Sequence, residues 1–218
     1  MSILVYRQDR YFYRKYGKRI LDVLFSTFAL IVLTPLFYLL MVAITIESHG
    51  GPFFFQKRFG KGFKPFRLIK FRSMLPVTAG STKDFEPGCT ARITTVGRIL
   101  RKTKADELPT LFNVLFGEMS LVGPRPEVEK YIRTYPEDFK TILKILPGLS
   151  DYASIKYRDE ETILGRQPDP EHYYCNVIMP DKLLLAKKYA KDASFGTDIR
   201  IIGQTIRRII GKAGCIKI

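Results

Sequence analysis

One continuous apolar segment dominates the first quarter of the chain. From Ile20 to Ile46 the sequence is ILDVLFSTFALIVLTPLFYLLMVAITI, and Asp22 is its only formal charge. A helix needs about 20 apolar residues to cross a bilayer, so this segment is long enough for a membrane helix. It is too long for the apolar part of a secretory signal, and no small-residue cleavage site follows it. We therefore expect residues 20–46 to remain in the protein as a membrane helix.

Two features of this segment favour a re-entrant helix, which enters and leaves the same leaflet. Pro35 follows Thr34 in mid-segment, and a proline removes a backbone donor and clashes with the preceding turn, so we expect the helix to bend there, with the break of a re-entrant helix at Thr34-Pro35. Both flanks are basic, and basic flanks tend to stay in the cytoplasm. A kinked transmembrane helix is the alternative, since proline is common in spanning helices. The basic flanking residues are Arg7, Arg10, Arg14, Lys15, Lys18 and Arg19 before the segment, and Lys57, Arg58, Lys61 and Lys64 after it.

The chain after the membrane segment alternates short apolar runs with turn residues. In GPFFFQKRFGKGFKPFRLIKFRSM a Gly and Lys turn separates two aromatic and aliphatic runs, which indicates a hairpin or an extended ribbon. Residues 75–91 have no periodicity and predict a loop. In ADELPTLFNVLFGEM, apolar residues at helical spacing predict a helix with Asp106 at or near its N-cap, Pro109 in its first turn and Gly117 at its end.

The C-terminal part of the sequence predicts several short helices. One face of the last of them carries four isoleucines at helical spacing, which fits an interfacial amphipathic helix. A terminal helix packed on the core with a solvated basic face fits equally well. The isoleucines are Ile199, Ile202, Ile206 and Ile209, the basic residues around them are Arg200, Arg207, Arg208 and Lys212, and the prolines that divide this region are Pro168, Pro170 and Pro180.

These elements predict a mainly helical α+β protein with one small cytoplasmic domain. The chain has 218 residues, which is enough for one compact domain and short for two. We expect a basic N-terminal flank at residues 1–19, the re-entrant helix at 20–46, and a cytoplasmic domain with a basic C-terminal helix at 47–218.

Charge and cysteine content narrow the class of partner. The formal net charge is +15, so anionic partners are expected: nucleic acid, anionic lipid headgroups or phosphate-rich substrates. Nucleic acid is disfavoured because the sequence has no recognisable DNA- or RNA-binding motif and the membrane segment has no use there. The cysteines, Cys89, Cys175 and Cys215, are too far apart for a disulfide framework or a zinc site, and they favour a reducing compartment.

Adjacent carboxylates, Asp106 and Glu107, lie in the densest basic region of the chain. Such a pair at a helix N-terminus ordinarily caps the helix. Here, however, the surrounding cations could hold several phosphate oxygens, and carboxylates among phosphates attract magnesium. The sequence has no GxGxxG or P-loop lysine motif, so the phosphate site would be of neither kind. The cations are Arg98, Arg101, Lys102 and Lys104 before the pair and Arg125 after it.

Several segments, in this order, resemble the bacterial monotopic phosphoglycosyl transferases, which start glycan assembly by transferring a sugar 1-phosphate to polyprenyl phosphate. They are KRILDV, the Pro-broken apolar segment, the hairpin sequence above, RKTKADELPTLFNVLFGEMSLVGPRPE and PGLSDYASIKYR. The family commonly has Ser-Leu where this chain has Lys104-Ala105, and PGITGWAQ where it has PGLSDYAS. These departures leave the identity of the sugar open. No long multi-span region precedes the catalytic part, so the resemblance is to the small single-domain type.

The resemblance implies a UDP-sugar donor, an undecaprenyl phosphate acceptor, magnesium, and a place at the cytoplasmic face of the bacterial inner membrane, against anionic phospholipid. Asp106 would be the nucleophile that releases UMP, Glu107 a base or metal-shell residue, and both would be metal ligands. The cations expected to bind substrate phosphates are Lys70, Arg72, Arg101, Arg125 and Arg158. Two rival hypotheses remain: a non-enzymatic membrane-surface binder, and a hydrolase that uses water as acceptor. The sequence does not determine the glycan pathway, the polyprenyl length or the oligomeric state.

Overall fold

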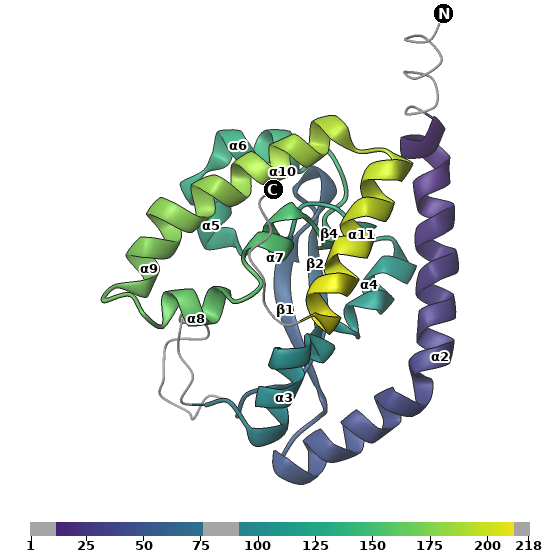
Figure 1. Cartoon of the computed structure of the whole chain (residues 1–218), viewed down its shortest axis with the longest axis vertical. Helices are drawn as coiled ribbons and strands as arrows, with labels where there is room; N and C mark the ends of the chain where they lie inside the picture. The colour runs from purple at the N-terminus through teal and green to yellow at the C-terminus, as the bar shows by residue number, and fades with distance from the viewer. Residues whose placement is uncertain (1–11, 76–91, 212–218) are drawn as a thin grey trace, which may run out of the picture.

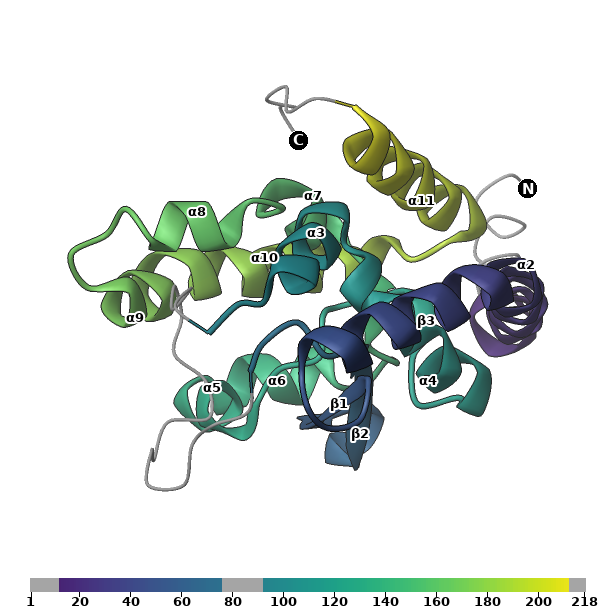
Figure 2. The same cartoon turned by 90° about the horizontal axis from the view of Figure 1, so that it is seen from below.

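A long helix, α2 (Lys18–Glu47), runs along one edge of the molecule and continues a short π-helical turn, η1 (Tyr13–Gly17). The computed structural model describes residues 12–75 and 92–211, so most of the predicted loop at 75–91 lies outside the described residues, as do Arg7, Arg10 and Lys212. Short helices and two small sheets form the rest of the molecule (Figures 1 and 2). The predicted mainly helical α+β fold is confirmed.

The helix α2 is continuous through Pro35, and it is bent between its first and second halves (Figure 1), so the bend expected at the Thr34-Pro35 break is present without an interruption of the helix. A proline removes one hydrogen bond from the helical ladder, and the bonds on either side preserve the helix around the bend. The Thr34 hydroxyl adds a local bond, because it donates to the Leu30 carbonyl oxygen at 2.8 Å.

Most of the α2 surface is apolar and exposed. Within its most apolar stretch only 11% of the residues are buried, and by length and composition this is the one helix of the described chain that could cross a membrane. A contiguous apolar surface of this size is rare on a soluble monomer, and it fits a lipid environment. The exposed large apolar side chains of α2 are Ile20, Leu24, Phe25, Phe28, Ile31, Val32, Leu36, Tyr38, Leu39, Val42 and Ile46.

The predicted hairpin is confirmed. Strands β1 (Phe53–Phe59) and β2 (Pro65–Phe71) pair antiparallel, with Phe53 opposite Phe71 and Phe59 opposite Pro65. A short turn, η2 (Lys61–Phe63), connects them. Phe66 and Leu68 of β2 are buried in a cluster with Val114 of α4 (Thr110–Phe116), and Phe71 is buried in a second cluster with residues of α2 and α3 (Thr95–Thr103).

The segment that carries the two adjacent carboxylates folds as two helices joined by a tight turn. Helix α3 (Thr95–Thr103) is followed by a single 3₁₀ turn, η3 (Ala105–Glu107), and then by α4 (Thr110–Phe116). Asp106 therefore lies inside the 3₁₀ turn and caps no helix, which corrects its predicted N-cap position. The predicted end at Gly117 is confirmed, since this residue has a φ of +86°, which favours glycine.

Asn113 fastens α4 to the edge of β2. Its side chain is fully buried; Oδ1 accepts a hydrogen bond from the Ile69 amide at 3.0 Å, and Nδ2 donates to the Arg67 carbonyl oxygen at 2.8 Å. Nδ2 also donates to Glu118 Oε2 at 2.6 Å. At the outer edge of β2, the Ile69 amide and the Arg67 carbonyl therefore bond to a side chain where a third strand would otherwise pair.

We expect Asn113→Ala to lower the free energy of unfolding by about 2 kcal/mol, because it leaves the part-buried Ile69 amide and Arg67 carbonyl without their side-chain partner. Denaturant unfolding of the detergent-solubilised protein measures this loss. Asn176→Ala is the matched control, since the Asn176 amide donates only to an exposed carbonyl, that of His172. Equal stability of the two variants would contradict the role given to Asn113.

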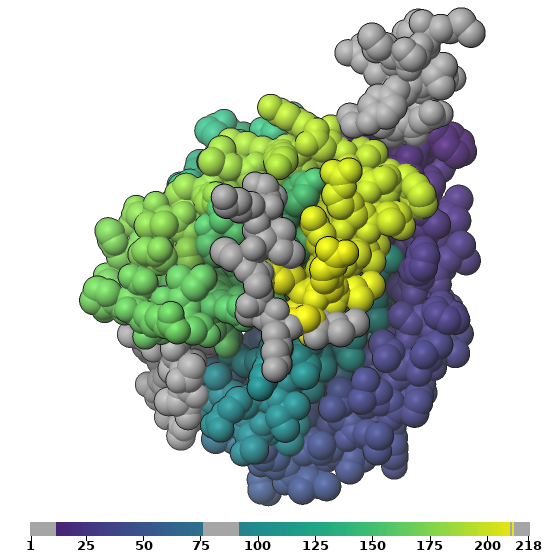
Figure 3. All heavy atoms as spheres, in the orientation of Figure 1, coloured from purple at the N-terminus to yellow at the C-terminus, as the bar shows by residue number. Residues whose placement is uncertain are grey.

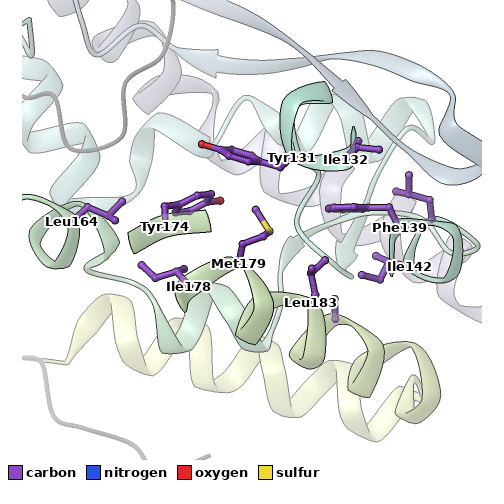
Figure 4. Close-up of a cluster of buried hydrophobic side chains, with 11 residues drawn as sticks. Tyr131, Ile132, Phe139, Ile142, Leu164, Tyr174, Ile178, Met179 and Leu183 are labelled. Atoms are coloured by element: carbon purple, nitrogen blue, oxygen red, sulfur yellow. The ribbon is translucent and has the colours of Figure 1, made fainter. Parts of the chain in front are cut away.

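A second sheet joins the hairpin and its helices to the C-terminal helices. Its strands, β3 (Ser120–Val122) and β4 (Gly148–Ser150), are parallel. The largest buried cluster lies between helices α5, α6 and α10 and includes Tyr131, Phe139 and Met179 (Figure 4). The helices of this region are α5 (Glu129–Thr134), α6 (Pro136–Ile142), α7 (Tyr152–Lys156), α8 (Glu160–Leu164), α9 (Pro170–Tyr173), the π-helical η4 (Tyr174–Ile178), α10 (Met179–Asp192) and α11 (Phe195–Ile210).

Helix α11 packs on the core through one face and exposes another that is apolar. Asp198 and Ile201 are buried, and Ile202 packs partly against the same cluster. Figure 3 shows α11 in yellow on the surface of the molecule. The helix is therefore a packed terminal helix whose outer face has the apolar character of an interfacial helix. The exposed apolar residues are Phe195, Ile199, Ile206 and Ile209.

Candidate active site

The turn η3 is held against the end of the hairpin by backbone contacts. The Thr94 amide, just before α3, donates to the Ser73 carbonyl oxygen at 3.2 Å. A Cβ at Gly97 would lie 2.0 Å from that oxygen, so only glycine permits this approach of α3. On the other side, the Thr110 hydroxyl donates to the Ile69 carbonyl oxygen at 3.0 Å. The two adjacent carboxylates are thereby fixed beside the last residues of β2.

Glu107 is held by two cations that come from distant parts of the chain. Lys70 Nζ, on β2, lies 2.9 Å from Glu107 Oε1. Arg125 donates from Nη1 to Oε2 at 3.2 Å and from Nη2 to Oε1, which makes a bidentate pair. Burial would raise the pKa of Glu107, but Arg125 and Lys70 reverse this effect and hold it well below its usual range. Glu107 is therefore ionised at neutral pH.

Asp106 has the opposite environment although it is the adjacent residue. It is 9% exposed, and its buried Oδ1 has no hydrogen-bond partner among the described residues. Burial raises the pKa of Asp106, and the positive charge of Lys70 opposes this only in part. A buried carboxylate oxygen without a partner costs free energy, so such an atom close to the positive charges of Lys70, Lys104 and Arg101 is a candidate for chemistry.

The backbone of Arg125 is held by residues on the side of it that faces away from Glu107. Its backbone amide donates to Asp151 Oδ2 at 3.3 Å, and Asp151 is the N-cap of α7, where it forms a capping box with Ser154. Next to it, Glu127 forms a buried ion pair with Arg58. Burial raises the pKa of Asp151, against the hydrogen bonds from Ser154. This layer fixes the backbone that presents the Arg125 guanidinium to Glu107.

The structure places the other predicted phosphate-binding cations differently. Arg101, at the end of α3, donates from Nε to Ser73 Oγ at 2.9 Å and pairs with Glu161 of α8. Arg72 donates to the His49 carbonyl oxygen at 3.1 Å, on the turn after α2. Arg158, just after α7, is half-buried. Within the described chain, neither Arg72 nor Arg158 has a contact with the two carboxylates.

The residues of the site fit a magnesium ion in part. Within residues 12–75 and 92–211, no group of three or more His, Cys, Asp or Glu side chains could hold a metal. Magnesium commonly takes one or two protein carboxylates and completes its shell with water and substrate phosphates. Oδ1 of Asp106 is available for this role, whereas both oxygens of Glu107 already accept from cations.

Sequence reasoning missed the residues that hold the site together. Asn113 had one visible signal, a polar residue inside the apolar run LFNVLF. Asp151 had another, because an aspartate followed three residues later by Ser154 is a capping pattern. Arg58 and Glu127 had none, since the two residues meet only in the folded protein.

A model of the bacterial sugar transferase family matches residues 13–212 of this chain. The chain belongs to the bacterial sugar transferase family. The match covers the two carboxylates, the hairpin, the whole of α2 and the C-terminal helices, so the resemblance seen in the sequence is confirmed at the level of the family.

Relatives within this family differ in length and in the sugar that they are named for. The chain is 33% identical over 196 residues, 88% of this chain and 43% of the relative, to a UDP-N-acetylgalactosamine-undecaprenyl-phosphate N-acetylgalactosaminephosphotransferase of Aeromonas hydrophila. It is 34% identical over 187 residues, 79% of this chain and 83% of the relative, to the exopolysaccharide production protein ExoY of Sinorhizobium fredii. A UDP-glucose:undecaprenyl-phosphate glucose-1-phosphate transferase of Klebsiella pneumoniae is 37% identical over 154 residues, 68% of this chain and 33% of the relative. The chain thus spans less than half of the first and third of these relatives.

Proposed function

We propose that this sugar transferase moves a sugar 1-phosphate from a UDP-sugar to undecaprenyl phosphate, as the first membrane step of bacterial glycan assembly. The single observation that carries the proposal is the buried Oδ1 of Asp106, which has no hydrogen-bond partner in the described chain and lies in a region of positive charge. The names of the relatives support a nucleotide sugar as donor and undecaprenyl phosphate as acceptor. Those names differ in the sugar, so the proposal leaves the sugar open.

In the first step, Asp106 Oδ1 attacks the phosphorus atom nearest the sugar, which is joined to the sugar through an oxygen that is transferred with it. A new bond forms between this oxygen and phosphorus, the bond to the bridging oxygen of UMP breaks, and UMP leaves with that electron pair. An ionised carboxylate needs no base for this attack, and a covalent intermediate replaces one difficult displacement with two easier ones. Lys70 and Arg125, which pair with Glu107, and Arg101, whose charge acts on Asp106, would neutralise charge that develops on the phosphoryl oxygens.

In the second step, a phosphate oxygen of undecaprenyl phosphate attacks the same phosphorus, and the Asp106 carboxylate leaves. Glu107 is a poor base for this step, because its pKa is held well below its usual range. A phosphate oxygen that is already ionised needs no base. We infer that Glu107 instead fixes Lys70 and Arg125 in place.

Asp106 would hold a magnesium ion together with substrate oxygens, and Glu107 would join this shell only by sharing an oxygen with its cations. When bound, the metal supplies positive charge to the transferring phosphoryl group. The cations of the chain act on the same charge. A role for Arg72 and Arg158 in binding substrate stays a prediction.

We propose a re-entrant path for α2, because both of its ends contact the same domain. Near its start, Lys18 pairs with Asp198 of α11, and at its end Glu47 accepts hydrogen bonds from the first residues of α3. A spanning helix would separate these ends by about 30 Å of hydrocarbon. With the domain on the cytoplasmic face of the inner membrane, the apolar face of α11 would lie at the interface, and the basic flanks would contact anionic phospholipid. Acceptor phosphates at headgroup level would then reach the site.

The raised pKa of Asp106 predicts an acid limit to activity. Only the ionised carboxylate attacks, and a raised pKa keeps the proton on Asp106 to a higher pH than for an ordinary aspartate. We expect kcat/KM for UMP release to fall with decreasing pH through an apparent pKa above the ordinary value of 3.8. A pH profile of the rate at low donor concentration measures it, and an activity that persists below pH 3.8 would contradict the assignment.

The proposed function is tested by incubating the purified protein with magnesium, undecaprenyl phosphate and a panel of UDP-sugars, and by analysing the products. UMP release that requires the lipid, with a lipid-linked sugar phosphate as product, is the expected result. Free sugar phosphate formed without lipid would identify a hydrolase. Binding of lipid vesicles without turnover of any donor would favour a membrane-surface binder.

A further inference from the structure

Arg19, at the start of α2, donates hydrogen bonds to the C-terminal end of α4, the helix that follows the two carboxylates. Its Nη1 donates to the Val114 carbonyl oxygen at 2.6 Å, and Nη2 donates to the Leu115 carbonyl oxygen at 2.8 Å. The last carbonyls of a helix have no partner within the helix and carry partial negative charge, which a guanidinium satisfies. The C-terminus of α4 is thus attached to the entry of the membrane helix.

Glu47, the last residue of α2, accepts hydrogen bonds from the N-terminal end of α3, the helix that precedes the two carboxylates. Its Oε1 accepts from the Thr95 amide at 2.6 Å, and its Oε2 accepts from the Val96 amide at 2.8 Å. The Thr94 hydroxyl accepts from the third amide, that of Gly97, at 2.9 Å. The first amides of a helix carry partial positive charge, which a carboxylate satisfies. The N-terminus of α3 is thus attached to the exit of the membrane helix.

The turn η3, which carries Asp106, lies between α3 and α4, the two helices that Glu47 and Arg19 of α2 contact. Lys104 alone separates α3 from this turn, and its φ of +60° makes the corner tight. A shift of either helix would therefore move Asp106 directly, since no flexible linker absorbs it. Arg19 and Glu47 each make two hydrogen bonds to their helix end. The positive Arg19 contacts the C-terminus of α4 and the negative Glu47 contacts the N-terminus of α3, which is the favourable sign at each end.

We propose that Arg19 and Glu47 are positioning residues, through which the two ends of the membrane helix set the angle between α3 and α4 and thereby the location of Asp106. The inference rests on the proposed function for its kinetic readout. On this proposal the bend in α2 affects catalysis, because it sets the distance between Arg19 and Glu47 at the two ends of the helix. Neither residue would touch the reacting atoms.

The test compares the full chain with its Arg19→Lys and Glu47→Gln variants in lipid nanodiscs. Lysine cannot donate to two carbonyls as a planar fork does, and glutamine has one acceptor oxygen where glutamate has two. We expect each variant to lower kcat roughly tenfold, since a small misplacement of a reacting group costs up to about 100-fold. The donor KM should stay within about twofold, because the phosphate-binding cations remain in place. Arg133→Lys and Glu137→Gln are matched controls on exposed helical ion pairs and should leave both constants unchanged.

A second readout does not depend on turnover. The amides of Glu107 and Leu108 donate to the carbonyls of Lys104 and Ala105 within the turn, and their hydrogen exchange should be faster in both variants. Unchanged kcat and unchanged exchange would overturn the inference, as would a fall in kcat matched by an equal loss of folded protein. If the unmodified chain turns over no donor, the proposed function fails, and the exchange rates alone decide the inference.

Discussion

Replacing Asp106 with asparagine is expected to lower kcat for UMP release by roughly 1,000-fold or more, because the amide cannot attack phosphorus. The same change should raise the melting temperature at neutral pH. Burial raises the pKa of Asp106, so its ionised form destabilises the folded state, and a neutral amide of equal size removes that cost. The gain should shrink as the pH falls and the wild-type carboxyl becomes protonated. Steady-state kinetics and thermal unfolding of the same samples measure both effects.

Asp159→Asn is the control for this substitution, since Asp159 is exposed and its side chain caps no helix. It should change neither rate nor melting temperature. An Asp106→Asn variant that keeps substantial activity would exclude Asp106 as the nucleophile. A variant that loses both activity and stability would show that Asp106 has a structural role.

Replacing Glu107 with glutamine is expected to lower both stability and activity. At neutral pH it leaves Lys70 and Arg125 largely buried beside a neutral side chain, and removal of one partner of a buried ion pair typically costs about 3–5 kcal/mol. We expect about 2–3 kcal/mol here, because water reaches part of the Arg125 side chain. The loss of kcat should be about 100-fold, since both cations lose their orientation.

The stability effect of Glu107→Gln has a defined pH dependence. The pKa of Glu107 is held below its ordinary value, so its contribution is complete above the ordinary value of 4.5 and is lost as the pH falls through the lower, folded-state value. Denaturant unfolding at neutral pH and at successively lower pH should therefore show a shrinking difference from wild type. Glu129→Gln, on an exposed pair with Arg133, should leave the free energy of unfolding nearly unchanged at any pH. A constant difference for Glu107→Gln would contradict the ion-pair account.

Local patterns in the sequence predicted the parts of the fold that local physics determines. The hairpin followed from two apolar runs around a glycine turn, and the end of α4 followed from Gly117. The bend in α2 followed from Pro35, although the helix is not interrupted at Thr34-Pro35, because one missing hydrogen bond bends a helix that the bonds on either side preserve. The N-cap position of Asp106 failed because the left-handed corner at Lys104 inserts a separate 3₁₀ turn before α4.

The candidate site could be located from the sequence, but the difference between its two carboxylates could not. Asp106 and Glu107 are adjacent, and burial raises the pKa of both carboxyls, but only at Glu107 do Arg125 and Lys70 reverse this effect, because they reach it from the loop after β3 and from β2. Their pairing depends on tertiary contacts that no local pattern encodes. The same reason explains Arg72, which shares the basic character of its neighbours but contacts the turn after α2.

The most direct test of the central claim is the intact mass of the protein after incubation with the UDP-sugar that it turns over and magnesium, without lipid. The account predicts an added mass equal to one sugar phosphate, absent in Asp106→Asn and lost when undecaprenyl phosphate is supplied. A chain that shows no added mass, although it forms lipid-linked product when both substrates are present, would contradict a covalent Asp106 intermediate and would indicate direct attack by the lipid phosphate.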